Sequence, residues 1–132
     1  MDDKDNSAMT NKSLLLVAHG SRREQSNNEV RQVTAMLKDR VGDRFVAVEC
    51  AFLELAEPSI PDGIECCVRQ GGEVVEVIPY FLSAGRHVAE DIPEQVDIKR
   101  REYPDIDIRI TRYLGAAEAI PEVLLSLLDG KS

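Results

Sequence analysis

The chain has 132 residues and a formal net charge of -8, a length that suits one domain with a single core. An acidic chain without a basic face lacks the surface that neutralises phosphates, so we expect no nucleic-acid partner. The longest apolar runs, such as 13–18 and 123–128, are far shorter than the roughly 20 residues that span a bilayer. We therefore expect a soluble protein with no membrane partner.

The first eleven residues, MDDKDNSAMTN, are polar and acidic, which predicts a disordered tail at 1–11 rather than a secretory signal. We expect residues 12–132 to form one domain and the protein to be cytoplasmic. Cys50 is isolated and Cys66 and Cys67 are adjacent, which is neither a disulfide framework nor a zinc motif. We interpret the three cysteines as small, mostly buried side chains.

The first half of the chain predicts a strand, a helix and a second strand. Residues 13–18 are almost wholly apolar, as expected of a central strand buried on both faces. Residues 24–40 carry valine and leucine at helical spacing, and Gly42 is typical of the end of such a helix. Residues 45–50 predict the second strand.

The second half continues this alternation. Pro58 and Pro61 are typical of a helix start, and Gly71 closes that helix. The remaining predicted elements are a strand at 73–80, a helix at 88–103 with Pro93 in its first turns, an alternating edge strand at 106–111 and an apolar helix at 116–128.

Four strands alternating with helices predict an α/β fold, a four-stranded parallel sheet flanked by helices with flavodoxin-like βα alternation. In such a sheet the loops that leave the carboxyl ends of the strands share one edge, where ligands bind. His19, Glu54 and His87 follow three different predicted strands. Four arginines fall on the same edge, namely Arg22, Arg23, Arg86 and Arg112.

These side chains indicate a candidate ligand site. Two neutral imidazoles can bind a divalent ion, and Glu54 can add charge or take a proton. So few protein ligands leave open positions, as a catalytic or transfer site requires. Taken alone, His19 is explained equally well as a structural residue at the end of a strand. Taken alone, His87 is explained as a solvated residue at the start of a helix. Arginines in an acidic chain indicate local attraction for carboxylates or phosphates, although surface arginines need no ligand.

Three motifs occur in order along the chain: LLLVAHGSR, AFLELAEPSI and VIPYFLSAGRHVAEDIP. Together they resemble the small class II tetrapyrrole chelatases, the sirohydrochlorin cobaltochelatase and ferrochelatase family of the small CbiX type. The resemblance covers residues 12–128. It implies a chelatase-like half-domain that pairs as a homodimer. It also implies insertion of a divalent metal into sirohydrochlorin, on the route to cobalamin or siroheme, with no cofactor beyond the metal substrate.

The resemblance also implies roles for particular residues. His19 is expected to be a metal ligand and proton acceptor, His87 the second metal ligand, and Glu54 a catalytic residue at the substrate. The macrocycle is expected to lie along Leu82, Ser83, Ala84, Gly85, Arg86 and His87. By our own inference, Tyr80, Phe81 and Leu82 contact the ring and the four arginines bind its carboxylates.

Cobalt is the metal we expect, with iron and nickel as alternatives. Nickel is disfavoured because the chain has only two histidines and so lacks the histidine-rich loop of some nickel-inserting archaeal relatives. A non-catalytic protein that binds metal or tetrapyrrole remains an alternative, since the same ligands serve both. A histidine phosphatase is disfavoured because Ala18 stands where that motif has arginine.

Overall fold

The computed structural model describes residues 11–128 and 130. Its strands are β1 (Lys12–Ala18), β2 (Ala47–Phe52), β3 (Val74–Pro79) and β4 (Asp107–Ile110). They form one parallel sheet in the order β2-β1-β3-β4. The predicted α/β fold with four parallel strands is confirmed, and so are the central place of the first strand and the edge position of the last. The order is that of a flavodoxin-like sheet.

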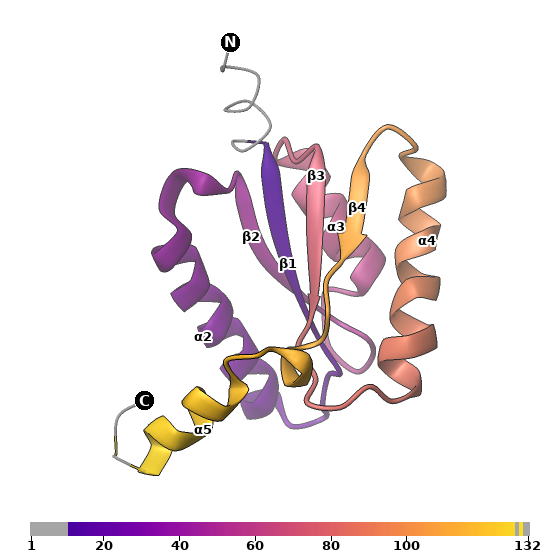
Figure 1. Ribbon diagram of the computed structural model, residues 1–132. Coiled ribbons are helices and arrows are strands. Elements are labelled where there is room, and N and C mark those ends of the chain that lie inside the picture. Colours follow the sequence, from indigo (N-terminus) through magenta and orange to yellow (C-terminus); the bar gives the residue numbers. More distant parts are fainter. Residues whose placement is uncertain (1–10, 129, 131–132) are drawn as a thin grey trace.

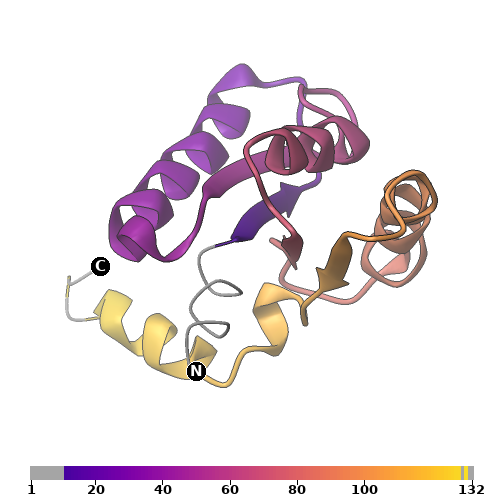
Figure 2. The same ribbon diagram turned by 90° about the horizontal axis from the view of Figure 1, so that it is seen from above.

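Three helices connect the strands, and a fourth follows β4. These are α2 (Glu24–Val41), α3 (Ile60–Arg69), α4 (Ile92–Glu102) and α5 (Ile120–Leu128), with a π-turn at His87–Asp91 and 3-10 turns at Gly42–Arg44 and Leu114–Ala116. In Figure 1, α2 and α4 lie on opposite sides of the sheet, with α3 behind it. Seen from above in Figure 2, α5 stands apart from the other helices.

The core has two parts because β1 is covered on both faces. Leu15 belongs to a large cluster with side chains of α3 and α4, such as Ile64 and Val96. The preceding residue, Leu14, belongs to a second cluster with Val41 at the end of α2. Successive side chains of a strand point to opposite faces. This double burial is the physical reason for the apolar run at 13–18.

The second strand and the helix predicted at 88–103 begin at other residues than expected. The second strand starts at Ala47 instead of Phe45, because Phe45 packs against the Leu14 cluster before the pairing of Ala47 with Ser13 begins. The helix predicted at 88–103 is preceded by the π-turn, and Ile92 donates its N–H to the carbonyl of His87. Pro93 has no N–H and its ring crowds the preceding turn, which favours this wider turn.

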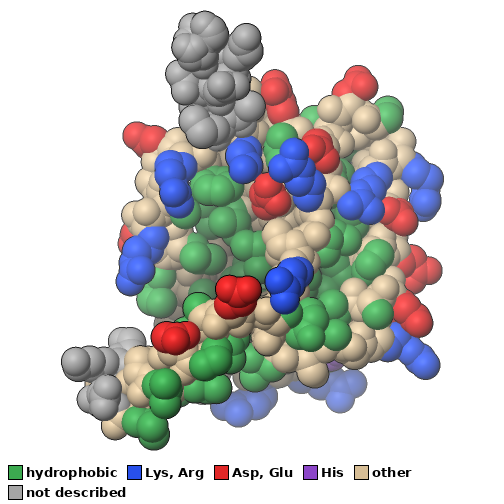
Figure 3. All heavy atoms as spheres, viewed as in Figure 1, with side chains coloured by type: hydrophobic (Ala, Val, Ile, Leu, Met, Phe, Trp, Pro, Cys, Tyr) green, Lys and Arg blue, Asp and Glu red, His purple; other side chains and the backbone are tan. Residues whose placement is uncertain are grey.

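The last helix begins at Ile120, four residues later than predicted, because residues 114–116 form a 3-10 turn. Its apolar side chains are exposed instead of packed, and Leu128 retains 80% of its accessible surface. Figure 3 shows apolar side chains gathered along this helix. No described helix is long and apolar enough to cross a membrane.

Residues 1–10 of the predicted tail lie outside the described residues. The carbonyl of Asn11 accepts a hydrogen bond from the Glu73 N–H at 2.8 Å. The cysteines differ in burial: Cys67 is buried and Cys50 is half-buried, but Cys66 is exposed. The expectation of mostly buried cysteines was therefore wrong for Cys66, which lies on the outer side of α3.

Candidate functional site

His19 and Glu54 are brought together by the segments that follow β1 and β2. The Glu54 N–H donates to the carbonyl of His19 at 3.1 Å. Gly20 has a φ of +96°, and a side chain there would overlap the Glu54 carbonyl oxygen. Only glycine adopts such a conformation readily. The glycine of the AHGSR motif therefore allows the two backbones to approach each other.

The His19 side chain lies between two oxygen acceptors. Its Nδ1 is 3.0 Å from the Gly20 carbonyl oxygen, which can only accept a hydrogen bond, so Nδ1 carries a proton. Its Nε2 lies 3.2 Å from Oε2 of Glu54. A proton or a cation can therefore lie between Nε2 of His19 and Oε2 of Glu54 and bind both.

His87 reaches the same point from the π-turn after β3. The ring centroids of His19 and His87 are 4.7 Å apart, and the planes are inclined by 63°. The Nδ1 of His87 lies 2.8 Å from Oδ2 of Asp91. Both histidines and Glu54 are partly exposed to solvent. The structure thus brings together all three residues that were predicted to converge, and leaves them accessible.

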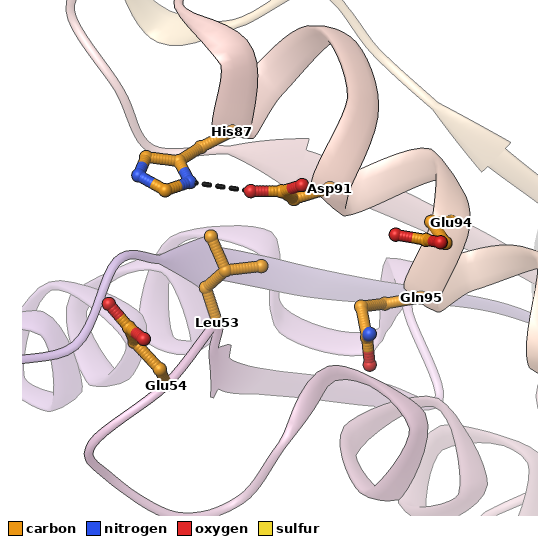
Figure 4. Close-up of a pocket in the computed structure, with 6 residues that line it drawn as sticks. All are labelled: Leu53, Glu54, His87, Asp91, Glu94 and Gln95. Atoms are coloured by element: carbon orange, nitrogen blue, oxygen red, sulfur yellow. Dashed lines mark hydrogen bonds and ion pairs between the residues drawn. The ribbon is translucent and has the colours of Figure 1, made fainter.

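Beside these residues is an open pocket of about 200 Å³, lined by Leu53, Glu54, His87, Asp91, Glu94 and Gln95. Figure 4 shows Asp91, Glu94 and Gln95 on the helical side of this pocket and Leu53 and Glu54 on the opposite side. Asp91, Glu94 and Gln95 were not predicted from the sequence. Asp91 had a detectable signal, because it stands four residues after His87, where helical side chains meet.

The remaining predicted residues are distributed around this edge. Leu82, Ser83, Ala84, Gly85 and Arg86 are all exposed. Leu82 keeps 74% of its accessible surface and is free to contact a ligand. Phe81, which we also expected at the macrocycle, is half-buried and packs partly against the large core cluster. The sequence alone could not predict that Leu82 is more exposed than Phe81, because the burial of both side chains depends on the loop conformation.

None of the four predicted arginines lines this pocket. Arg22 and Arg23 are exposed, and Arg86 lies 3.9 Å from Glu90 on the same turn. Arg112 donates a hydrogen bond to the Ala116 carbonyl at 2.9 Å. Within residues 11–128 and 130, no group of three or more His, Cys, Asp or Glu side chains is arranged to hold a metal ion.

Comparison with known proteins gives a consistent set of relatives. The chain is 40% identical over 111 residues to the chloroplastic sirohydrochlorin ferrochelatase of Arabidopsis thaliana, covering 84% of this chain and 48% of that protein. It is 31% identical over 111 residues to the sirohydrochlorin cobaltochelatase of Sulfurisphaera tokodaii, covering 84% of this chain and 86% of that one.

A solved structure has the same fold. It is the sirohydrochlorin chelatase SirB from Bacillus subtilis subspecies spizizenii in complex with cobalt, with a TM-score of 0.78 and 31% identity over 90% of this chain and 50% of that one. The chain thus spans about half the length of SirB and of the Arabidopsis protein. The family model CbiX matches residues 13–130. With the fold, the ordered motifs and these relatives in agreement, the chain belongs to the CbiX family.

Proposed function

We propose that this protein is a sirohydrochlorin chelatase, which inserts a divalent metal ion into sirohydrochlorin. The observation that carries the proposal is the facing pair His19 and His87, with ring centroids 4.7 Å apart and Glu54 within 3.2 Å of His19. The ferrochelatase and cobaltochelatase activities in the names of the relatives support the same reaction.

The chemistry of metal insertion matches these groups. The macrocycle must lose two inner N–H protons while the metal sheds water, so a base and an incompletely ligated metal are needed on one face of the ring. In our proposal, Nε2 of His19 and Nε2 of His87 bind the metal substrate. Glu54, beside His19, takes up one of the two protons that leave the macrocycle, and the other passes to solvent at the open edge of the sheet. Imidazole and carboxylate ligands accept cobalt, iron and nickel; cobalt is the metal we expect.

The surroundings suit a flat, carboxylate-bearing ring. We propose that the exposed segment Leu82–His87 lies along the macrocycle, with Leu82 in apolar contact. Leu55, exposed on the segment that carries Glu54, offers a second apolar contact. We infer that Arg22, Arg23 and Arg86 bind carboxylates at the rim of the ring, because guanidinium groups pair with carboxylates bidentately.

We also propose that the protein acts as a homodimer. Two observations support this state: the chain spans half of SirB, and α5 exposes a row of valine and leucine side chains. An apolar helix face of this kind requires a covering surface. In this arrangement the second copy supplies what the other half of the longer relatives supplies. A cytoplasmic location remains our expectation.

The decisive experiment is a chelatase assay with catalytic amounts of protein and excess sirohydrochlorin, followed by the absorbance change of the macrocycle. Cobalt, iron and nickel are offered separately. We expect turnover with cobalt, and a loss of at least roughly a hundredfold in His19→Ala and in His87→Ala, since each variant removes one of the two proposed protein ligands of the metal substrate. Both variants should fold, because both side chains lie at the sheet edge.

Arg40→Ala is a suitable control, because Arg40 is an exposed residue near the end of α2 and is remote in the fold from the three loops of the site. It should retain wild-type turnover. Stoichiometric binding of metal or sirohydrochlorin without turnover would instead identify a carrier protein. Near wild-type rates in both histidine variants would reject the proposed site.

A further inference from the structure

We propose that Asp91 is a positioning residue that fixes the tautomer and orientation of His87. The inference rests on the proposed function, to which it adds a residue absent from the predicted site. The carrying observation is the 2.8 Å contact between Oδ2 of Asp91 and Nδ1 of His87. Figure 4 shows the two side chains pointing toward each other from the π-turn, with the second ring nitrogen of His87 away from Asp91.

The chemistry of the contact decides where the imidazole proton lies. A carboxylate can only accept hydrogen bonds, so its partner Nδ1 must carry the proton. In a neutral imidazole the other nitrogen, Nε2, then carries the lone pair. A lone pair is needed to bind a metal ion or to accept a proton. Asp91 therefore holds His87 in the form in which Nε2 is reactive.

His19 is arranged in the same way by a different group. Its Nδ1 lies 3.0 Å from the Gly20 backbone carbonyl oxygen, which takes the place that Asp91 has at His87, while its Nε2 lies 3.2 Å from Oε2 of Glu54. Two histidines that converge at 4.7 Å are thus both engaged through Nδ1. The difference matters for experiments, because the Nδ1 partner of His87 is a side chain that can be replaced, whereas the Nδ1 partner of His19 is a backbone carbonyl, which a substitution does not remove.

The π-turn contributes to this geometry. His87 and Asp91 are its first and last residues, and Asp91 leads directly into α4. Metal-binding histidines in proteins commonly donate their second N–H to a carboxylate, and removal of such a partner costs about 10- to 100-fold in metal affinity or activity. We expect a loss of this size in kcat for Asp91→Ala.

The test compares Asp91→Ala, Asp91→Asn and Glu90→Gln. Glu90 is the neighbouring carboxylate on the same turn, is exposed and does not line the pocket, so Glu90→Gln removes an equal charge without removing the contact. The primary measurement is the ¹⁵N chemical shift of the imidazole nitrogens, recorded about two pH units above the ordinary histidine pKa of about 6.5. The chain has only two histidines, so both rings can be assigned.

In the wild type we expect His87 to carry its proton on Nδ1. Asp91→Ala should move the His87 signals toward the Nε2–H form and leave those of His19 unchanged. Asp91→Asn should lie between, because an amide oxygen can still accept the Nδ1–H. Glu90→Gln should match the wild type in the ¹⁵N spectrum of both histidines.

Unchanged His87 signals in Asp91→Ala would overturn the inference, as would a wild-type kcat in that variant. A far-ultraviolet circular dichroism spectrum shows whether each variant is folded. The imidazole spectra do not depend on turnover. If the wild type fails to insert any metal, the proposed function fails, while the expected shift in Asp91→Ala still supports the positioning role of Asp91.

Discussion

Gly20 determines whether the loops that carry His19 and Glu54 can approach each other. Its φ of +96° excludes most side chains, and a Cβ would also strike the Glu54 carbonyl oxygen. Gly71 has a similar φ of +104°, but a Cβ there would meet nothing within 4 Å. A comparison of alanine variants at the two glycines therefore separates the free-energy cost of the backbone conformation from that of the close contact with Glu54.

We expect Gly71→Ala to lower the free energy of unfolding by about 1–2 kcal/mol, the cost of a left-handed conformation for a residue with a side chain. Gly20→Ala should lower it further and should also reduce metal insertion, because Glu54 must move away from His19. Urea denaturation of both variants measures the two costs. Equal losses of stability would show that the contact with Glu54 is unimportant.

The cysteines differ in reactivity at the same scale. Burial raises the pKa of the Cys67 thiol to about 12, and only the thiolate is reactive. We expect iodoacetamide at about pH 8 to modify exposed Cys66 in the folded protein and to leave Cys67 unmodified. In Cys66→Ser, the peptide that contains Cys67 should gain the label only in urea, as followed by mass spectrometry. Rapid labelling of Cys67 in that folded variant would contradict its burial.

Among the elements, α3 and α4 are joined by a polar contact as well as by the core. Glu65 of α3 accepts hydrogen bonds from Lys99 of α4 at 2.8 Å and from the Tyr103 hydroxyl at 2.9 Å. Arg69 adds a third bond at 2.7 Å. The bonds from Lys99, Arg69 and Tyr103 lower the pKa of Glu65 from 4.5 to about 2.

This shift predicts a specific acid sensitivity. Because the pKa is lower in the folded state, the carboxylate stabilises the fold fully above pH 4.5, and this stabilisation is lost as the pH falls toward 2. We expect Glu65→Gln to be less stable than the wild type at neutral pH, and the difference to shrink between pH 4.5 and 2.

Thermal unfolding across that pH range provides the measurement. Glu29→Gln, which removes an exposed carboxylate from α2, is the matched control and should follow the wild-type curve. If the loss of stability in Glu65→Gln stayed constant down to pH 2, the Glu65 side chain would stabilise the fold through its packing and not through its charge.

At the scale of the whole molecule, α5 exposes an apolar face. Leu124 and Leu128 stand four residues apart and are mostly exposed, so they lie on one face of the helix. In the proposed homodimer this face is part of the contact. We expect the wild type at micromolar concentration to have twice the 14.7 kDa mass of one chain.

The double variant Leu124→Asp with Leu128→Asp should have the mass of a single chain by light scattering. Met36→Asp is the control, because Met36 is an equally exposed apolar residue on α2, and it should leave the mass of the dimer unchanged. A wild-type protein with the mass of one chain would reject the homodimer.

The amino-acid pattern was sufficient for the fold and for the convergence of three residues at one edge of the sheet. Apolar residues on both faces of 13–18 mark a central strand because every side chain there is buried. Parallel strands place their carboxyl ends on one edge, so the convergence of His19, Glu54 and His87 followed from their positions after three strands. Both inferences depend on local periodicity and on a general rule of chain topology.

Tertiary structure decided the contacts between side chains. The approach of His19 to Glu54 depends on the Gly20 conformation, and the contact between His87 and Asp91 depends on a π-turn that the helical pattern did not predict. The exposure of Leu82 beside half-buried Phe81, and of the apolar face of α5, likewise depends on how loops and helices pack. Contacts between residues distant in the chain are set by packing in three dimensions, which the spacing of residue types does not encode.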